Sequence, residues 1–295
     1  MDKYKYKREV KSVRWLLFGV ILSLFATEVI FEAVISFMSV PPHKYLRMTI
    51  VEIAAFMFPL FIFKNTSLKK FNNYKMLRLN QISYSDVLLV VLLGMGGQFI
   101  MMVLNLPLQY ISKVFFHAGE VAAKPGDISF WTVLFGIIAV GILPSLLEEF
   151  WMRGLVFGVF DKTSTKDAIY FTTFIFAIFH GSLEELPGYI FMGVMAAFVL
   201  LKFNSLYAAV LYHLASNLTA LFFSMVIRNL VGYLWMIFTG MTLMFIAIFF
   251  IINKTKKANI VKSDKKTNLF FESIISLPII LSMVIVILKY CIINM

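Results

Sequence analysis

The chain of 295 residues is 60% hydrophobic, carries only 15% charged residues and has a mean hydropathy of +0.86. A soluble protein of this length needs far more polar surface, so the composition excludes a soluble globular protein and indicates a membrane protein. The net charge of +11 does not indicate a nucleic-acid partner, because Lys and Arg stand between apolar segments. The single cysteine excludes an intramolecular disulfide and a cysteine-rich metal site.

The apolar segments are long and continuous, which is typical of transmembrane helices rather than of barrel strands. We therefore predict an all-α fold, a polytopic helical membrane protein with eight or nine transmembrane segments. Residues 1–14 form a basic N-terminus and 15–295 a single transmembrane domain. The count is eight if the short segment 187–201 is re-entrant or the last segment is peripheral. The nine segments lie at 15–40, 48–63, 84–112, 129–160, 168–181, 187–201, 205–227, 230–252 and 269–291.

Basic residues predict which ends of these segments face the cytoplasm. If each segment spans once, 20 of the 27 Lys and Arg residues fall in the N-terminus and in every second loop, and six fall in the other loops. The remaining one, Arg153, lies inside an apolar segment. Because positively charged loops stay in the cytoplasm, this split predicts a multi-pass protein of the cell membrane with nine crossings and a cytoplasmic N-terminus.

Two adjacent carboxylates and a guanidinium interrupt the apolar segment 129–160. A charged side chain at the centre of the bilayer costs about 3 kcal/mol or more and generally marks a functional site. On a helix, Glu149 and Arg153 are four residues apart and can form an ion pair. Glu148 points to a different face, so this carboxylate is predicted to be free for chemistry.

Pro144 precedes these charged residues and is expected to interrupt the helix, because proline lacks a backbone N–H. The segment is also too long for one straight crossing, at about 32 residues. We expect a break near Leu143–Ser145, with Ser145 capping a second helical piece and both glutamates in its first turn.

Two other groups of residues have structural explanations. Glu28, Glu32 and Glu52 lie in the first two segments, and we expect them at the outer surface or paired with Lys44 or Arg47. Glycines recur in two further segments, where they indicate close helix packing rather than chemistry. These glycines are Gly94, Gly96, Gly97, Gly154 and Gly158.

Two later segments place histidines within apolar sequence. His180 ends the fifth segment, and His213 lies in the seventh, four residues before Asn217 on the same helix face. At about 1.5 Å per residue, Glu148, His180 and His213 lie at a similar depth, roughly 12–18 Å from the cytoplasmic face. A carboxylate, two imidazoles and an amide at one depth predict a polar pocket inside the membrane, which we expect to open to the cytoplasmic side.

Three spacings occur in order within these segments: Glu-Glu-x-x-x-Arg, Phe-x-x-x-His and His-x-x-x-Asn. Together they resemble the CAAX-protease and bacteriocin-processing family of intramembrane proteases, also called the Abi family. The resemblance covers about residues 145–220, inside a protease core expected at 129–227. The residues that carry it are Glu148, Glu149, Arg153, Phe176, His180, His213 and Asn217.

The resemblance implies an intramembrane endopeptidase in which Glu148 and His180 activate a water molecule. His213 and Asn217 would stabilise the oxyanion, since imidazole and amide N–H groups are suitable donors for developing negative charge. A zinc enzyme would use Glu148, His180 and His213 as ligands with an open fourth position. No His-Glu-x-x-His helix is present, and we favour the metal-free mechanism without a cofactor.

The same resemblance implies roles for the remaining motif residues and the kind of partner that the protein binds. Glu149 and Arg153 would form a structural ion pair, and Phe176 would pack beside His180 in the pocket. The partners would be membrane lipid and a membrane-associated peptide or protein substrate. Bacterial members imply the maturation of secreted peptides such as bacteriocin precursors, or self-immunity against them. The sequence leaves the oligomeric state and the cleavage site open.

Two functions of other classes use similar residues. A transporter or channel needs a continuous polar path, whereas these polar residues cluster at one depth. A non-catalytic membrane scaffold or immunity protein that regulates a membrane partner is the alternative that stays open. Loss of peptide cleavage after substitution of Glu148 and His180 would distinguish the enzyme from the scaffold.

Overall fold

The computed structural model describes residues 3–38, 43–63, 74–116, 129–226, 230–254 and 269–293. All regular elements in these ranges are helical, which confirms the predicted all-α class. Besides a short turn at Tyr74–Leu77, the helices are α1 (Lys3–Ile35), α2 (Lys44–Phe63), α3 (Tyr84–Phe116), α4 (Phe130–Gly136), α5 (Leu143–Glu149), α6 (Phe157–Phe160), α7 (Thr165–Phe179), α8 (Leu186–Phe203), α9 (Leu206–Val226), α10 (Leu230–Lys254), α11 (Leu269–Ile274) and α12 (Leu277–Ile293).

The helices correspond to the expected apolar segments and make the chain a multi-pass membrane protein. α8 is one uninterrupted helix of 18 residues and is long and apolar enough to span a membrane, and the count of eight or nine crossings stays a prediction. The shorter or more polar helices α2, α7 and α12 would complete the proposed eight or nine crossings. Six described stretches are long and apolar enough to span a membrane: Tyr6–Ile35, Tyr84–Phe115, Phe130–Phe160, Leu186–Phe203, Leu206–Ser224 and Ile237–Lys254.

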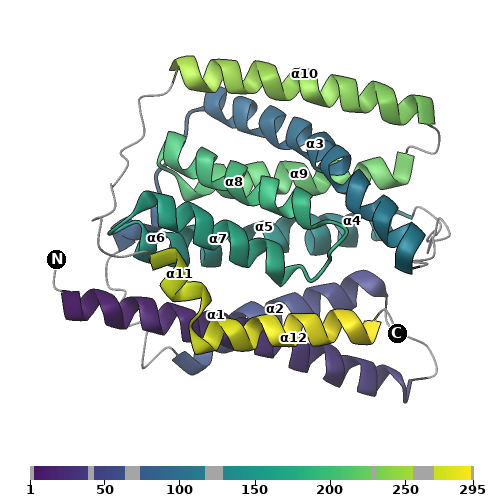
Figure 1. The fold of residues 1–295 in the computed structure, drawn as a ribbon. Coiled ribbons are helices and arrows are strands. Elements are labelled where there is room, and N and C mark those ends of the chain that lie inside the picture. Colours follow the sequence, from purple (N-terminus) through teal and green to yellow (C-terminus); the bar gives the residue numbers. More distant parts are fainter. Residues whose placement is uncertain are drawn as a thin grey trace.

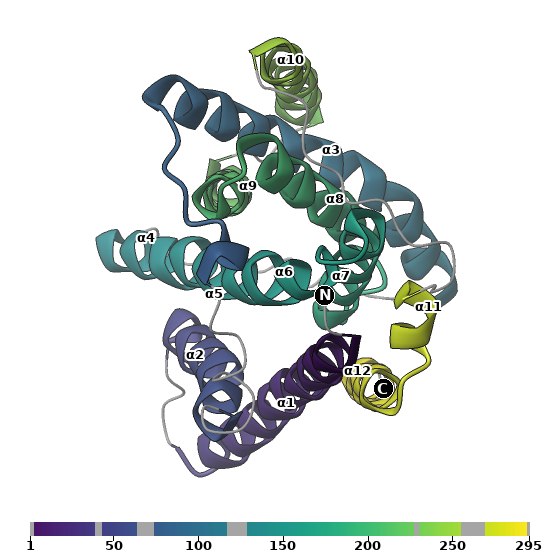
Figure 2. The same cartoon turned by 90° about the vertical axis from the view of Figure 1, so that its left-hand side faces the viewer.

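The helices run roughly parallel to one another in successive layers (Figure 1). α10 packs on the outside of α3, and α3 packs in turn on α8 and α9. α1, α2 and α12 lie together on the opposite side of the molecule, beyond α5 and α7 (Figure 2). The continuous helix from α4 to α6 therefore lies between two groups of helices and can contribute side chains to both.

The described residues of the segments that are predicted to be cytoplasmic lie together at one end of the molecule. The connection between α1 and α2 lies at the other end, where Lys289 of α12 donates to Glu28 of α1 at 2.9 Å. This common location agrees with alternating crossings, and the cytoplasmic assignment of that end stays a prediction. The contacts at the basic end join Lys162 to Glu9, Arg78 to Asp161, Asn80 to Asn204 and Lys254 to Asp86.

Residues Phe130–Phe160 form one continuous helix, so the expected break near Leu143–Ser145 is wrong. Two stretches of this helix, Ile137–Ile142 and Phe150–Val156, widen into π-helical turns. Such turns often occur at functional sites, and here one lies on each side of α5.

Pro144 lies in the first turn of α5, directly after the first wide turn. The wide turn lets the chain pass the proline without ending the helix. Ser145 is not a cap, because its hydroxyl donates to the carbonyl of Ile142 at 3.0 Å. The glutamates therefore lie in the middle of a long helix rather than at a helix N-terminus.

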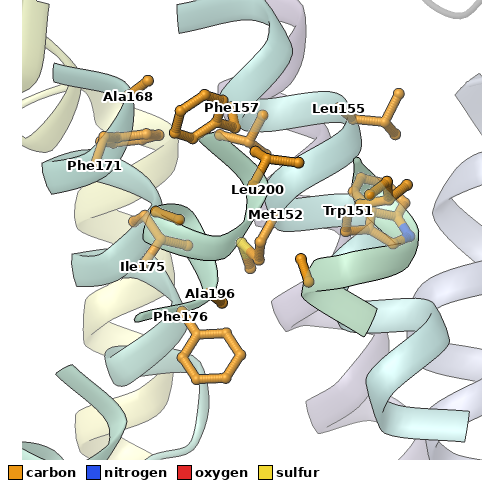
Figure 3. Close-up of a cluster of buried hydrophobic side chains, with 14 of the residues drawn as sticks. Trp151, Met152, Leu155, Phe157, Ala168, Phe171, Ile175, Phe176, Ala196 and Leu200 are labelled. Atoms are coloured by element: carbon orange, nitrogen blue, oxygen red, sulfur yellow. The ribbon is translucent and has the colours of Figure 1, made fainter. Parts of the chain in front are cut away.

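Apolar side chains of this helix pack against α7 and α8 in the principal core (Figure 3). Phe157, Phe171 and Leu200 are fully buried there, one from each of the three helices. On the other side, Trp151 contacts Phe56 of α2, with ring centroids 6.3 Å apart. This packing holds α7, α8 and α2 against the helix that carries the charged residues.

Glycines of α3 allow close helix packing, as predicted. A Cβ atom at Gly94 would lie only 2.4 Å from the carbonyl oxygen of Tyr212 in α9. A Cβ atom at Gly96 would lie 2.4 Å from the carbonyl oxygen of Gly240 in α10. Because both contacts are with backbone, a larger residue would push the helices apart.

We expect Gly94→Val to destabilise the protein by about 1–3 kcal/mol or more, because the valine side chain overpacks the interface of α3 with α9. Thermal unfolding of the purified protein in detergent measures the effect. Met95→Val, at the partly exposed neighbouring position, is the matched control. Equal unfolding temperatures of the two variants would contradict this account of the interface.

Candidate active site

Two adjoining cavities lie inside the helical domain. The larger, of about 340 Å³, is lined by residues of α2, α3, α5, α8 and α9. The smaller, of about 250 Å³, lies on the side of α1, α2 and α7. Met48, Glu52, Glu148 and His180 line both cavities and mark their junction. The larger cavity also contains His213 and Asn217, and the smaller one Phe176.

Glu149 is the centre of a buried network behind the cavities. Its Oε1 accepts hydrogen bonds from Nη1 of Arg153 and from Nδ1 of His213, each at 2.9 Å. Nη2 of Arg153 donates to the carbonyl of Gly193 in α8 at 3.1 Å, and its guanidinium lies 4.7 Å from the centroid of Phe176. The side chains of Glu149 and Arg153 are 0% exposed. The spacing predicts only the i,i+4 ion pair. The hydrogen bonds also join the helix of Glu149 and Arg153 to α8 and α9.

His180 follows the last residue of α7, and its ring orientation is well defined. Its Nδ1 lies 2.8 Å from the carbonyl oxygen of Phe176, which can only accept, so Nδ1 is the protonated nitrogen. The ring stacks on Tyr189 at a centroid distance of 3.7 Å and contacts Phe176 at 4.7 Å. Nε2, the nitrogen with the free lone pair, lies 3.8 Å from Oε2 of Glu148.

That separation is too long for a direct hydrogen bond. It is suitable for a water molecule that contacts both groups. Oε2 of Glu148 is buried and has no hydrogen-bond partner in the described part of the chain. Oε2 of Glu148 and Nε2 of His180 are therefore two hydrogen-bond acceptors that face the same small volume of the cavity.

Asn217 binds a backbone carbonyl that has no helical hydrogen-bond partner, because Pro144 cannot donate to it. Nδ2 of Asn217 donates to the carbonyl of Val140 at 3.0 Å. Pro144 is four residues after Val140 and has no N–H, so it cannot form the usual helical bond to this carbonyl. The amide group of Asn217 keeps a second N–H, which is available to the cavity.

The cavities do not extend toward the basic end, whereas an opening to the cytoplasmic side was predicted, and which side of the membrane that end faces stays a prediction. None of the described residues at that end lines either cavity. The smaller cavity extends instead toward Glu28, Arg47 and Lys289, near the connection of α1 with α2. Arg47 forms the expected ion pair with Glu32, whereas Glu28 binds Lys289 from the last helix.

Sequence reasoning missed two carboxylates of the site. Glu52 was expected at the surface or beside a basic residue, but it lies at the junction of the cavities. Glu185 follows His180 in the loop before α8 and accepts a hydrogen bond from the hydroxyl of Tyr189 at 2.6 Å. A usable signal for Glu52 was its helical spacing, four residues after Met48 and four before Phe56, which indicates one inward face.

The donor groups do not fit the zinc alternative. No group of three or more His, Cys, Asp or Glu side chains lies close enough to hold a metal ion within the ranges described above. We therefore derive no step through a metal, and the metal-free mechanism stays a prediction.

The fold and the cavity define a polytopic helical membrane protein with a buried site of carboxylate, imidazole and amide groups. Residues 130–219 match the family model for type II CAAX prenyl endopeptidase Rce1-like proteins. The match contains all seven residues of the three spacings and confirms the resemblance that they indicated. No curated protein and no solved structure matches the chain.

Proposed function

We propose that the protein is an intramembrane endopeptidase that hydrolyses peptide bonds of membrane-associated peptides or proteins. The observation that carries the proposal is the separation of 3.8 Å between Oε2 of Glu148 and Nε2 of His180 inside the cavity. The Rce1-like match over residues 130–219 supports the same reaction class. A scaffold does not need two unpaired acceptors that face one water-sized volume.

In the proposed reaction, a water molecule donates hydrogen bonds to Glu148 and to Nε2 of His180. Glu148 removes a proton as the water oxygen attacks the carbonyl carbon of the substrate. The free N–H of Asn217 and the ring of His213 stabilise the resulting oxyanion. Glu148 then returns the proton to the leaving nitrogen, and the C–N bond breaks.

His213 can act as an oxyanion donor only in one protonation state. A neutral ring that donates from Nδ1 to Glu149 has an unprotonated Nε2, which cannot donate. The doubly protonated ring has Nε2–H as well, so in this form His213 can donate to the oxyanion while Nδ1 stays bonded to Glu149. We therefore assign Glu149 a second role beside its ion pair, as the residue that orients His213.

The proposed topology places the cavity toward the outer side of the membrane. The basic end is cytoplasmic by the positive-inside rule, and the cavity extends toward the opposite end. A site in this position is suited to secreted peptides, such as bacteriocin precursors, that reach it during or after export. The alternative remains a non-catalytic immunity protein of the membrane.

Cleavage by the purified full-length protein in lipid nanodiscs tests the proposal. A pooled library of synthetic peptides is the substrate, and mass spectrometry detects new termini. We expect cleavage by the native sequence and none by His180→Ala. Absence of cleavage by a correctly folded native protein, or equal cleavage by the variant, would favour the scaffold.

Removal of the Asn217 amide should slow the reaction while substrate binding is retained. We expect Asn217→Ala to lower kcat about 100- to 1,000-fold, with a much smaller change in KM, because one oxyanion donor is lost. Thr219→Ala is the control in the same helix, since its hydroxyl donates to the carbonyl of Ala215 in its own helix. A variant that changed KM alone would contradict the assigned role.

Chelation should leave the activity unchanged. We expect the same cleavage rate in EDTA or 1,10-phenanthroline as in buffer, because the proposed base and acceptor are both protein groups. A zinc protease assayed in parallel shows that the chelators are effective. Loss of activity with recovery on added zinc would establish the metal mechanism instead.

A further inference from the structure

Glu52 lies outside the segment that matches the family and has no assigned role. It is on the inward face of α2, and it lines both cavities together with Glu148 and His180. Glu52 is therefore next to the proposed base Glu148 at the junction of the two cavities. Oε1 of Glu52 is buried and has no hydrogen-bond partner among the residues described.

A buried carboxylate is normally compensated by a cation or by hydrogen bonds. The larger cavity has three carboxylates in its lining, Glu52, Glu148 and Glu185, and no lysine or arginine. The basic side chains beside the smaller cavity and behind the site are already engaged. They pair as Arg47 with Glu32, Lys289 with Glu28 and Arg153 with Glu149.

The junction of the cavities is therefore acidic, and no cation pairs with Glu52 among the residues that the structure describes. We infer that Glu52 is a specificity residue that binds a basic side chain of the substrate, Lys or Arg, close to the scissile bond. The inference rests on the proposed peptidase function. Apolar residues of the same cavity wall, Met48 and Phe56, would contact the aliphatic part of that side chain.

The position of Glu52 explains why the subsite is close to the bond that breaks. Glu52 and Glu148 line the same junction, so a side chain bound by Glu52 belongs to a residue near the carbonyl that the water attacks. A buried charge pair of this kind gives selectivity, because a substrate without the cation leaves the carboxylate uncompensated.

Internally quenched peptides of one apolar sequence test the inference. After the pooled library has located the cleaved bond, each position within three residues of it carries Lys, its uncharged isostere norleucine, or Glu. At one position we expect the native protein in nanodiscs to prefer Lys over norleucine by about tenfold or more in kcat/KM. Glu52→Gln should remove this preference, measured as the ratio of kcat/KM for the Lys and norleucine peptides, and Glu52→Lys should reverse it toward Glu.

The control variant is Glu272→Gln, which changes an exposed carboxylate of α11 and should keep the preference. A native protein that cleaves peptides without a basic preference at any position overturns the inference and leaves the peptidase intact. An equal slowing of all peptides by Glu52→Gln also overturns it, because it indicates a role in catalysis or folding. A native protein that cleaves none of the peptides overturns the proposed function itself.

Discussion

Glu148→Gln is expected to abolish peptide cleavage while the protein stays folded. The glutamine keeps the size of the side chain but cannot remove a proton from water. Loss of a general base typically lowers the rate about 100- to 10,000-fold, and the assay should show a fall within or beyond this range. kcat/KM on the best peptide from the library measures it.

The folded state should not suffer from this substitution. Among the described residues Oε2 of Glu148 is buried without a hydrogen-bond partner, and two further carboxylates, Glu149 in the same helix and Glu52 across the cavity junction, are close to it. Replacing this carboxylate by a neutral amide removes charge repulsion, so the unfolding temperature should be unchanged or higher. Stability gained at the expense of activity is typical of functional residues.

The matched control and a double variant separate catalysis from structure. Glu272→Gln, the same change on the surface of α11, should keep full activity. Glu148→Gln combined with His180→Ala should be no slower than the slower single variant, because the two residues act on one water molecule. Residual activity of Glu148→Gln within tenfold of the native rate would refute its role as the base.

Arg153→Met should cause the largest loss of stability. The arginine donates to Glu149 and to the carbonyl of Gly193, and both side chains of the ion pair are fully buried. Removing it leaves a buried carboxylate without its cation, which typically costs about 3–5 kcal/mol. Unfolding in mixed micelles, followed by tryptophan fluorescence, measures the loss.

Arg47→Met is the matched control, since its ion pair with Glu32 is on the surface. The two side chains are 37% and 57% exposed, and such pairs contribute less than about 1 kcal/mol. Arg153→Met combined with Glu149→Leu should recover part of the stability, because no uncompensated charge remains. That double variant should stay inactive, since His213 loses its acceptor. Equal losses in Arg153→Met and Arg47→Met would contradict the buried network.

The fold class and the grouping of Glu148, His180, His213 and Asn217 at one depth could be predicted from the sequence because both depend on local spacing. Long apolar runs specify helices of membrane length, and a spacing of four residues places Glu149 beside Arg153 and His213 beside Asn217 on common faces. Similar depth within their segments brought Glu148, His180 and His213 to one level. These predictions need only the regular rise of a helix.

Interactions between helices that are distant in the sequence could not be predicted from local spacing. Pro144 predicts a break when it is read locally, but the wide π-helical turn keeps the helix continuous and the unused carbonyl of Val140 binds Asn217. The local pattern also predicted a pocket that opens to the cytoplasmic side, whereas the cavity extends away from the basic end.

The sequence by itself determined that this is a helical membrane protein with a glutamate and histidine motif in its centre. Only the tertiary structure decided that Glu149 holds His213, and that Glu52 from α2 faces Glu148. The reason is physical: helix periodicity sets which residues share one face of one helix. Which faces of different helices meet depends on packing and on the pairing of buried charges, and neither has a fixed sequence spacing.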